Sequence, residues 1–248
     1  LNEVYRENLD FKDFNNVKKK IKLNKSYNSK QRNILINYTK IAELNKKSKV
    51  LEIGCQFALF HNIHNNYIGI DINPNLINFA KKLHKKKLNL IVADATKIPI
   101  KQQVDFIFSF ATIEHIKKPD LVFNEIDRIL KKGGVVLLAP AWNCRKYTVQ
   151  KLQFRNYKDL TIPLKISKFL IPLQNNLLFR AIQRFPFRIF DELMHLFKKR
   201  IKFRYSRLYP NYNLWGKYPP RADDDAVVNM DAHSAIIHFL SKGYKCIS

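Results

Sequence analysis

Short apolar runs alternate with amphipathic segments between residues 49 and 141. The runs are rich in β-branched and aromatic residues and end at turn-forming residues, which predicts strands at 49–54, 67–71, 88–92, 104–110 and 134–139. Two of the segments between them carry Pro74 or Pro119 in their first turn and apolar residues at helical spacing, which predicts helices. Near-continuous apolar strands that alternate with amphipathic helices predict a mostly parallel sheet flanked by helices, an α/β fold.

The pattern differs on both sides of this stretch. Residues 1–48 are polar with one amphipathic segment, and they predict an N-terminal helical cap on a core at 49–141. The alternation stops after Ala141, and we expect residues 142–221 to form an insertion after the fifth strand. Residues 222–248 predict a return to the core, with a helix at 234–240 and the start of a sixth strand at 244–247.

The positive charge is concentrated in the expected insertion. The chain holds 45 Lys and Arg against 20 Asp and Glu, a net charge of +25. Residues 145–221 alone hold 18 basic and 3 acidic residues, a net +15, together with 15 of the 31 aromatic residues. Three interpretations stay open, in this order: a lid over the substrate, a membrane or glycolipid docking face through residues 161–203, and an RNA-binding face. An amphipathic helix packed on its own domain accounts for the same pattern.

Cysteine content and apolar run length exclude several classes of protein. Cys55, Cys144 and Cys246 are odd in number and lack metal-ligand spacing, which excludes a disulfide scaffold and a structural zinc site. The longest apolar stretches are far shorter than the roughly 18 residues that a membrane span needs. We expect a cytoplasmic protein, with peripheral membrane contact as an alternative.

Distinctive residues follow four of the predicted strands. Parallel α/β sheets bind ligands beyond the carboxyl ends of their strands. Those ends carry residues 54–57, 71–72, 94–95 and 110–115, and they therefore locate the candidate site.

Five segments stand in order at a familiar spacing: Val-Leu-Glu-Ile-Gly-Cys (50–55), Gly-Ile-Asp-Ile-Asn-Pro (69–74), Ala-Asp-Ala (93–95), Phe-Ser-Phe-Ala-Thr-Ile-Glu-His-Ile (108–116) and Leu-Lys-Lys-Gly-Gly (130–134). Together they resemble the class I S-adenosylmethionine-dependent methyltransferases, in the small-molecule branch. The resemblance covers roughly residues 48–141, with a weaker echo in 222–248. It implies a Rossmann-like fold whose final antiparallel strand would follow the Cys246 strand, beyond Ser248.

The resemblance implies S-adenosylmethionine as cofactor and S-adenosylhomocysteine as product. The cofactor-binding residues it implies are Glu52, Gly54, Cys55, Gln56, Asp71, Ile72, Asp94, Ala95 and Phe110. Gly54 would let backbone approach the methionine moiety, and Glu52 would organise the loop near its amino group. Asp71 would accept the two ribose hydroxyls, while Asp94 would meet the adenine amino group beside the Ala95 N–H.

The loop after Cys55 departs from the family. The family usually carries further glycines there, whereas this chain reads Gln56-Phe57-Ala58. Side chains at these positions would crowd a cofactor. Either the loop takes another path with Gln56 bonded to the ligand, or cofactor binding is weakened or lost.

We predict a methyltransferase that acts on oxygen or nitrogen of a small-molecule or glycan-type acceptor, lipid-linked acceptors included. His115 is a candidate general base, and a role in shaping the loop is the alternative. The aspartates at 223–225 are read as a solvated turn, because consecutive carboxylates cannot all face one metal ion. Two other functions stay open, an RNA methyltransferase and a non-catalytic binding protein that docks through its basic insertion.

Overall fold

The computed structural model describes residues 25–84, 87–219, 221 and 223–247. Contacts between Cα atoms divide the chain into two compact units. The first unit comprises Leu1–Ile113 and Lys118–Pro140, and the second comprises Glu114–Lys117 and Ala141–Ser248. The expected end of the core near residue 141 therefore coincides with a boundary between units.

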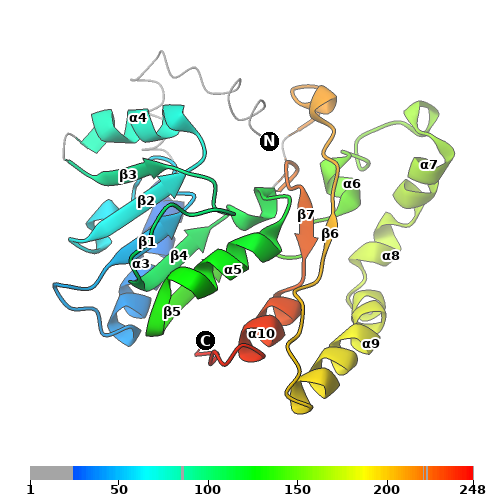
Figure 1. Cartoon of the computed structure of the whole chain (residues 1–248). Coiled ribbons are helices and arrows are strands. Elements are labelled where there is room, and N and C mark those ends of the chain that lie inside the picture. The colour runs from blue at the N-terminus through cyan, green and yellow to red at the C-terminus, as the bar shows by residue number, and fades with distance from the viewer. Residues whose placement is uncertain (1–24, 85–86, 220, 222, 248) are drawn as a thin grey trace. The chain divides into compact units, whose positions relative to one another are not determined.

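A five-stranded sheet with the order β3-β2-β1-β4-β5 forms the centre of the first unit (Figure 1). Its strands are β1 (Val50–Ile53), β2 (Tyr67–Asp71), β3 (Asn89–Val92), β4 (Val104–Phe110) and β5 (Leu130–Ala139). All four neighbouring pairs are parallel. The predicted Rossmann-like, mostly parallel sheet is thus confirmed.

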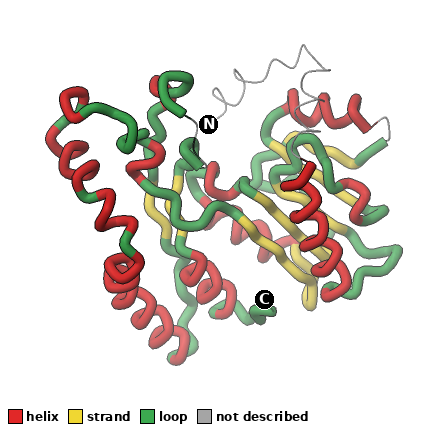
Figure 2. The backbone as a smooth tube through the Cα atoms, turned by 180° about the vertical axis from the view of Figure 1, so that it is seen from behind, coloured by secondary structure: helices red, strands yellow, loops and turns green. Residues whose placement is uncertain are grey.

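Helices cover both faces of this sheet. Figures 1 and 2 show α3 (Lys25–Ile41) and α5 (Pro119–Ile129) on opposite faces. The helices α4 (Pro74–His84) and α5 begin at the two prolines that the sequence placed in a first turn. Short 3₁₀ turns lie at η1 (His61–Ile63) and η2 (Ile113–His115). Because both faces are covered, the residues of β1 are buried throughout, Glu52 included.

The second unit is mainly helical. Its helices are α6 (Lys146–Val149), α7 (Ile162–Phe169), α8 (Ile171–Asn175), α9 (Leu177–Leu196) and α10 (Ala232–Leu240), with 3₁₀ turns η3 (Tyr157–Asp159) and η4 (Tyr212–Leu214). An antiparallel pair, β6 (Tyr205–Arg207) and β7 (Val228–Met230), forms its two-stranded sheet.

Two expectations for the ends of the chain are not met by the structure. Residues 244–247 adopt no strand, and residues 222–248 cluster with the second unit instead of returning to the first. The Val228–Met230 segment pairs with Tyr205–Arg207, a pairing that the sequence pattern did not suggest. The helical cap is described only from Lys25 onward, so its expected part at 1–24 lies outside the described residues.

The junction between α5 and β5 also differs from expectation. The sequence predicted that this strand covers residues 134–139. In the structure β5 already begins at Leu130, which pairs with Val104, and the register then shifts before Phe106 pairs with Val135. The shift accommodates the left-handed Gly133 (φ +80°) within the strand.

Candidate functional site

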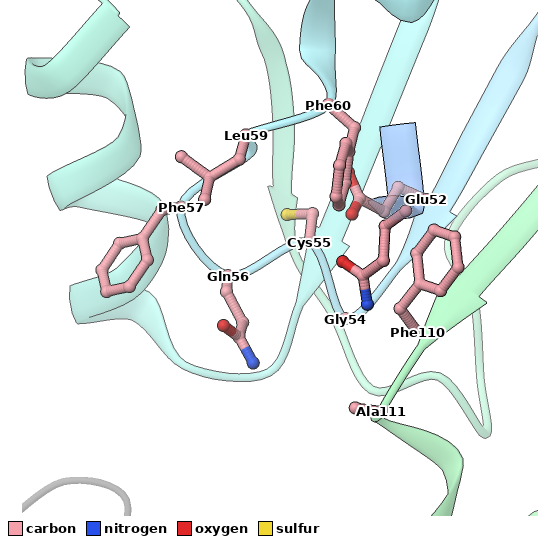
Figure 3. Close-up of a pocket in the computed structure, with 10 residues that line it drawn as sticks. Glu52, Gly54, Cys55, Gln56, Phe57, Leu59, Phe60, Phe110 and Ala111 are labelled. Atoms are coloured by element: carbon pink, nitrogen blue, oxygen red, sulfur yellow. The ribbon is translucent and has the colours of Figure 1, made fainter. Parts of the chain in front are cut away.

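A pocket lies in the first unit beyond the carboxyl ends of β1 and β4 (Figure 3). Its cavity volume is about 100 Å³, and the pocket is partly open to solvent. The lining residues are Gln31, Glu52, Gly54, Cys55, Gln56, Phe57, Leu59, Phe60, Phe110 and Ala111. Five of the predicted cofactor residues are therefore brought together here: Glu52, Gly54, Cys55, Gln56 and Phe110.

Glu52 is a buried acid in this pocket. It is 4% exposed, and its Oε2 accepts a hydrogen bond from the Tyr67 hydroxyl. Burial raises the pKa of Glu52 to about 8, with the Tyr67 hydrogen bond acting in the opposite direction and the Asp71 charge adding to the rise. No cationic side chain of the described residues forms an ion pair with Glu52. A cationic group that entered the pocket would therefore stabilise its carboxylate.

Asp71 fastens the loop after β1 to the end of β2. Its Oδ2 accepts the Gln56 N–H at 2.9 Å, and its Oδ1 accepts the Asn73 N–H at 2.9 Å. Burial raises the pKa of Asp71, while these backbone hydrogen bonds oppose the rise. Each carboxylate oxygen has two lone pairs, so both retain capacity for a ligand hydroxyl. Asp71 does not itself line the pocket.

The loop that lacks glycines adopts glycine-like backbone conformations. Gln56 has φ +45° and Ala58 has φ +51°, both in the left-handed region. The Gln56 side chain is exposed, and Figure 3 shows it pointing away from Glu52, Phe60 and Phe110. Gln56 and Phe57 nevertheless both line the pocket, so the crowding that the sequence led us to expect in this loop stays a prediction.

Gly54 is required by a neighbour that sequence reasoning did not identify. A Cβ at Gly54 would lie 2.2 Å from the Oγ1 of Thr112, and Gly54 itself has φ +76°. Thr112 Oγ1 donates to the Phe110 carbonyl at 2.8 Å, which fixes its side chain beside Gly54. The sequence held no signal for this contact, because 58 residues separate the two positions.

The remaining predicted cofactor residues lie outside the pocket lining. Ile72, directly after β2, is 48% exposed. Asp94 follows β3 and is exposed, and its Oδ1 accepts hydrogen bonds from the Thr96 N–H and hydroxyl, each at 2.8 Å. Ala95 is half-buried in the same turn.

Glu114 and His115 lie in the second unit beside the aspartates of 223–225. Glu114 is fully buried; its Oε1 accepts the Ala141 N–H at 3.1 Å, and its Oε2 has no hydrogen-bond partner among the described residues. His115 Nδ1 lies 3.5 Å from Asp225 Oδ2. Burial raises the pKa of Glu114, and burial together with the Asp225 charge raises that of Asp223.

The aspartates form a turn, as the sequence suggested, but the turn is not fully solvated. They are half-buried, and Asp224 pairs with Lys151, which is 2% exposed. Within the described part of the chain, no group of three or more His, Cys, Asp or Glu residues is arranged to hold a metal ion.

The pocket residues fit S-adenosylmethionine. A buried acid without a cationic partner suits a ligand that carries an ammonium and a sulfonium charge. The faces of Phe60 and Phe110 supply apolar surface, and Gly54 leaves its backbone uncovered by a side chain.

The chain is similar to known methyltransferases and to uncharacterized proteins. Residues 51–138 match a family model described as a methyltransferase domain. The chain is 27% identical to an uncharacterized protein of Methanocaldococcus jannaschii over 64% of this chain and 78% of that protein. It is 26% identical to a ubiquinone biosynthesis O-methyltransferase of Pelagibacter ubique, over 59% of this chain and 68% of that protein. A malonyl-[acyl-carrier protein] O-methyltransferase of Ilyobacter polytropus is 34% identical to it, over 36% of this chain and 38% of that protein.

Solved structures give a weaker likeness. A Bacillus YcgJ protein matches with a TM-score of 0.42 and 22% identity, over 48% of this chain and 56% of that one. A Clostridium acetobutylicum S-adenosylmethionine-dependent methyltransferase matches with a TM-score of 0.43 and 15% identity, over 62% of this chain and 59% of that one. The chain thus spans little more than half the length of these structures. The assignment rests on the family model, the parallel strand order and the ordered motifs: residues 51–138 are a class I S-adenosylmethionine-dependent methyltransferase domain.

Proposed function

We propose that this protein transfers a methyl group from S-adenosylmethionine to oxygen or nitrogen of a small-molecule or glycan-type acceptor and releases S-adenosylhomocysteine. The observation that carries the proposal is the pocket at the ends of β1 and β4, where the buried Glu52 has no cationic partner among the described residues. The bound cofactor supplies an electrophilic methyl group. The chain's own residues hold the cofactor, exclude water and receive the acceptor.

Each proposed cofactor residue has a distinct task. Glu52 pairs with the cofactor's ammonium group, and Phe60 and Phe110 keep water from its methionine end. Asp71 accepts the ribose hydroxyls with the lone pairs that the backbone leaves unused, and the exposed Ile72 offers an apolar face to the adenine. Asp94 and Ala95 meet the polar edge of the adenine.

His115 is the proposed general base that accepts a proton from the acceptor, and its Nδ1 lies 3.5 Å from Asp225 Oδ2. Carboxyl oxygens of Glu114 and Asp225 lie 3.9 Å and 3.5 Å from the ring nitrogens of His115, and we propose that these acidic neighbours favour an acceptor with an amine over one with a carboxylate. Glu114 follows the pocket residue Ala111 by three positions in the sequence.

Calorimetric titration with S-adenosylmethionine and S-adenosylhomocysteine tests the cofactor site. We expect saturable binding that Asp71→Ala weakens about tenfold to a hundredfold, since hydrogen bonds to charged groups contribute roughly 1.5–3 kcal/mol. Asp159→Ala, a change at an exposed aspartate of the second unit, is the matched control and leaves binding unchanged. Absence of binding to well-folded wild-type protein would refute the proposal and favour the non-catalytic alternative.

The acceptor class needs a separate assay. Amine acceptors, each matched with its hydroxyl analogue, are incubated with the cofactor, and release of S-adenosylhomocysteine is measured. If only the amines are methylated, the result supports the proposal that the acidic residues around His115 determine which acceptor is used. The RNA alternative predicts binding of RNA whose affinity falls steeply with salt concentration.

The partners of the basic insertion also belong to this proposal. We assign residues 161–203 a peripheral role at a membrane surface, where they would bring the protein to a lipid-linked acceptor, with the protein otherwise in the cytoplasm. The exposed apolar side chains of α7, α8 and α9 support this role.

A further inference from the structure

The helices α7, α8 and α9 expose an unusual number of large apolar side chains. The α7–α9 apolar surface consists of Ile162, Ile166, Phe169, Leu173, Leu177, Leu178, Ile182, Phe185, Phe187, Ile189, Phe190, Leu193, Leu196 and Phe197. Each of these side chains is at least 42% exposed, and they are 14 of the 24 exposed large hydrophobic side chains of the described residues. The three helices follow one another along one edge of the second unit in both views (Figures 1 and 2). Large apolar side chains that are exposed in such number on consecutive helices are unusual for a soluble monomer.

Helix α9 turns its polar stripe inward. Arg180, Arg184, Arg188, Asp191 and His195 follow each other at three- or four-residue spacing, and all five are less exposed than the apolar stripe. The sequence left open that a helix of this region packs its apolar face on its own domain. Of the apolar residues at helical spacing there, Phe190, Leu193, Met194, Phe197 and Ile201, only Ile201, beyond the end of α9, is buried. The orientation of α9 is thus the reverse of that of an ordinary surface helix.

Ion pairs fix this reversed orientation. Arg188 binds Asp231 at 2.9 Å, and the buried Asp191 pairs with Arg204. His233 of α10 lies 2.9 Å from Glu192. Rotating α9 to bury its apolar stripe would break these pairs. The apolar surface is therefore held outward by contacts within the unit.

The charges around the surface indicate its occupant. Residues 161–203 hold nine Lys and Arg against two acidic residues, and one of those two is the buried, paired Asp191. Lys165, Lys198, Lys199, Arg200 and Lys202 are exposed around the apolar side chains. A second copy of the chain would bring two such basic surfaces together, whereas lipid phosphates would neutralise them. No helix of the described residues is long and apolar enough to cross a bilayer.

We propose that the α7–α9 apolar surface docks on a bilayer that contains anionic lipid. The apolar side chains enter the boundary between head groups and acyl chains, and the basic residues bind lipid phosphates. This inference rests on the peripheral role proposed above and adds the surface and the lipid charge; vesicle binding is measured without cofactor or acceptor, so its failure is distinguishable from a failure of methyl transfer.

Vesicle co-sedimentation tests the proposal. Full-length protein is mixed with phosphatidylcholine vesicles, with or without about one third phosphatidylglycerol. We expect at least about tenfold stronger partitioning to the anionic vesicles, and weakening as salt is raised. Replacing Lys198, Lys199 and Arg200 by Gln removes most of that preference.

A matched pair of triple variants tests the apolar part. Ile182→Gln, Phe185→Gln and Leu196→Gln alter one stripe of α9, and partitioning is expected to fall at least about tenfold. Ile34→Gln, Leu121→Gln and Ile236→Gln alter exposed apolar residues of α3, α5 and α10, and leave it unchanged. Circular dichroism establishes that both triple variants are folded.

Two outcomes would overturn the proposal. One is wild-type protein that does not sediment with anionic vesicles. The other is a wild-type dimer in sedimentation-velocity ultracentrifugation that the α9 triple variant converts to monomer, which would make a second copy the occupant.

Discussion

Gly54 is the position where one added methyl group tests the geometry of the pocket loop most directly. In Gly54→Ala the new Cβ would lie 2.2 Å from Thr112 Oγ1 and 2.3 Å from its Cγ2, well inside contact distance. The residue would also keep φ +76°, a conformation that costs a non-glycine residue about 1–2 kcal/mol. Overpacking adds about 1–3 kcal/mol, so the variant is expected to lose roughly 2–5 kcal/mol of unfolding free energy.

Gly133→Ala is the matched control for the backbone contribution. Gly133 has φ +80°, and an added Cβ there would meet no atom within 4 Å. Its expected cost is therefore the conformational part alone, about 1–2 kcal/mol. The difference between the two variants isolates the contact with Thr112.

A double-mutant cycle with Thr112→Ala checks the same contact. Thr112→Ala removes Oγ1 and Cγ2 but leaves its own Cβ 2.8 Å from the added methyl group, so the relief is partial. We expect a coupling free energy of about 1–2 kcal/mol between the two positions. Urea unfolding followed by circular dichroism measures all four proteins. The reasoning would be refuted if Gly54→Ala cost no more than Gly133→Ala, or if Thr112→Ala recovered nothing.

Three further predictions concern charge and backbone. Because the pKa of Glu52 is raised to about 8 from 4.5, the folded state retains a proton that the unfolded state loses, so unfolding free energy should fall as pH rises between those values. Glu52→Gln should flatten this dependence of the unfolding free energy on pH, measured by urea titrations at a series of pH values. An unchanged dependence in the variant would contradict the raised pKa of Glu52. Asp224→Ala leaves the buried Lys151 charge without its partner and should cost about 3–5 kcal/mol, whereas Lys151→Met should cost less; equal losses would count against the ion pair. Gln56→Gly relieves a left-handed non-glycine residue and should stabilise the fold by up to about 1 kcal/mol, measured by thermal unfolding, while cofactor affinity is retained.

The sequence predicted the first unit well because local patterns determine its elements. The bounds of β2 and β4 agree with the apolar runs, and α4 and α5 begin at Pro74 and Pro119. A parallel sheet buried on both faces needs such runs, so the pattern and the fold are linked directly. Five of the predicted cofactor residues line one pocket for the same reason, since the ends of parallel strands meet at one edge of a sheet.

The second unit was predicted poorly because its arrangement depends on distant partners. Apolar spacing in 177–197 indicates an amphipathic helix but not which face is covered. That choice follows from Asp191 and its partner Arg204, and from Arg188 and Asp231, residues 13 and 43 positions apart. The pairing of Tyr205–Arg207 with Val228–Met230 is likewise specified by contacts that no local pattern encodes.

The loop after Cys55 lacks the glycines of the family, but its backbone adopts the positive φ angles that glycines would provide. Glycine is favoured in such loops because it adopts positive φ at no cost and leaves space for a ligand. Gln56 and Ala58 adopt positive φ at a cost of about 1–2 kcal/mol each. The loop accepts that cost with the Gln56 N–H bound to Asp71 and the Ala58 N–H bound to the Cys55 carbonyl at 2.7 Å. The Gln56 side chain points away from Glu52, Phe60 and Phe110, but Gln56 and Phe57 both line the pocket. The calorimetric titration therefore tests the space that this loop leaves for the cofactor as well as the charge and hydrogen-bonding groups of the pocket.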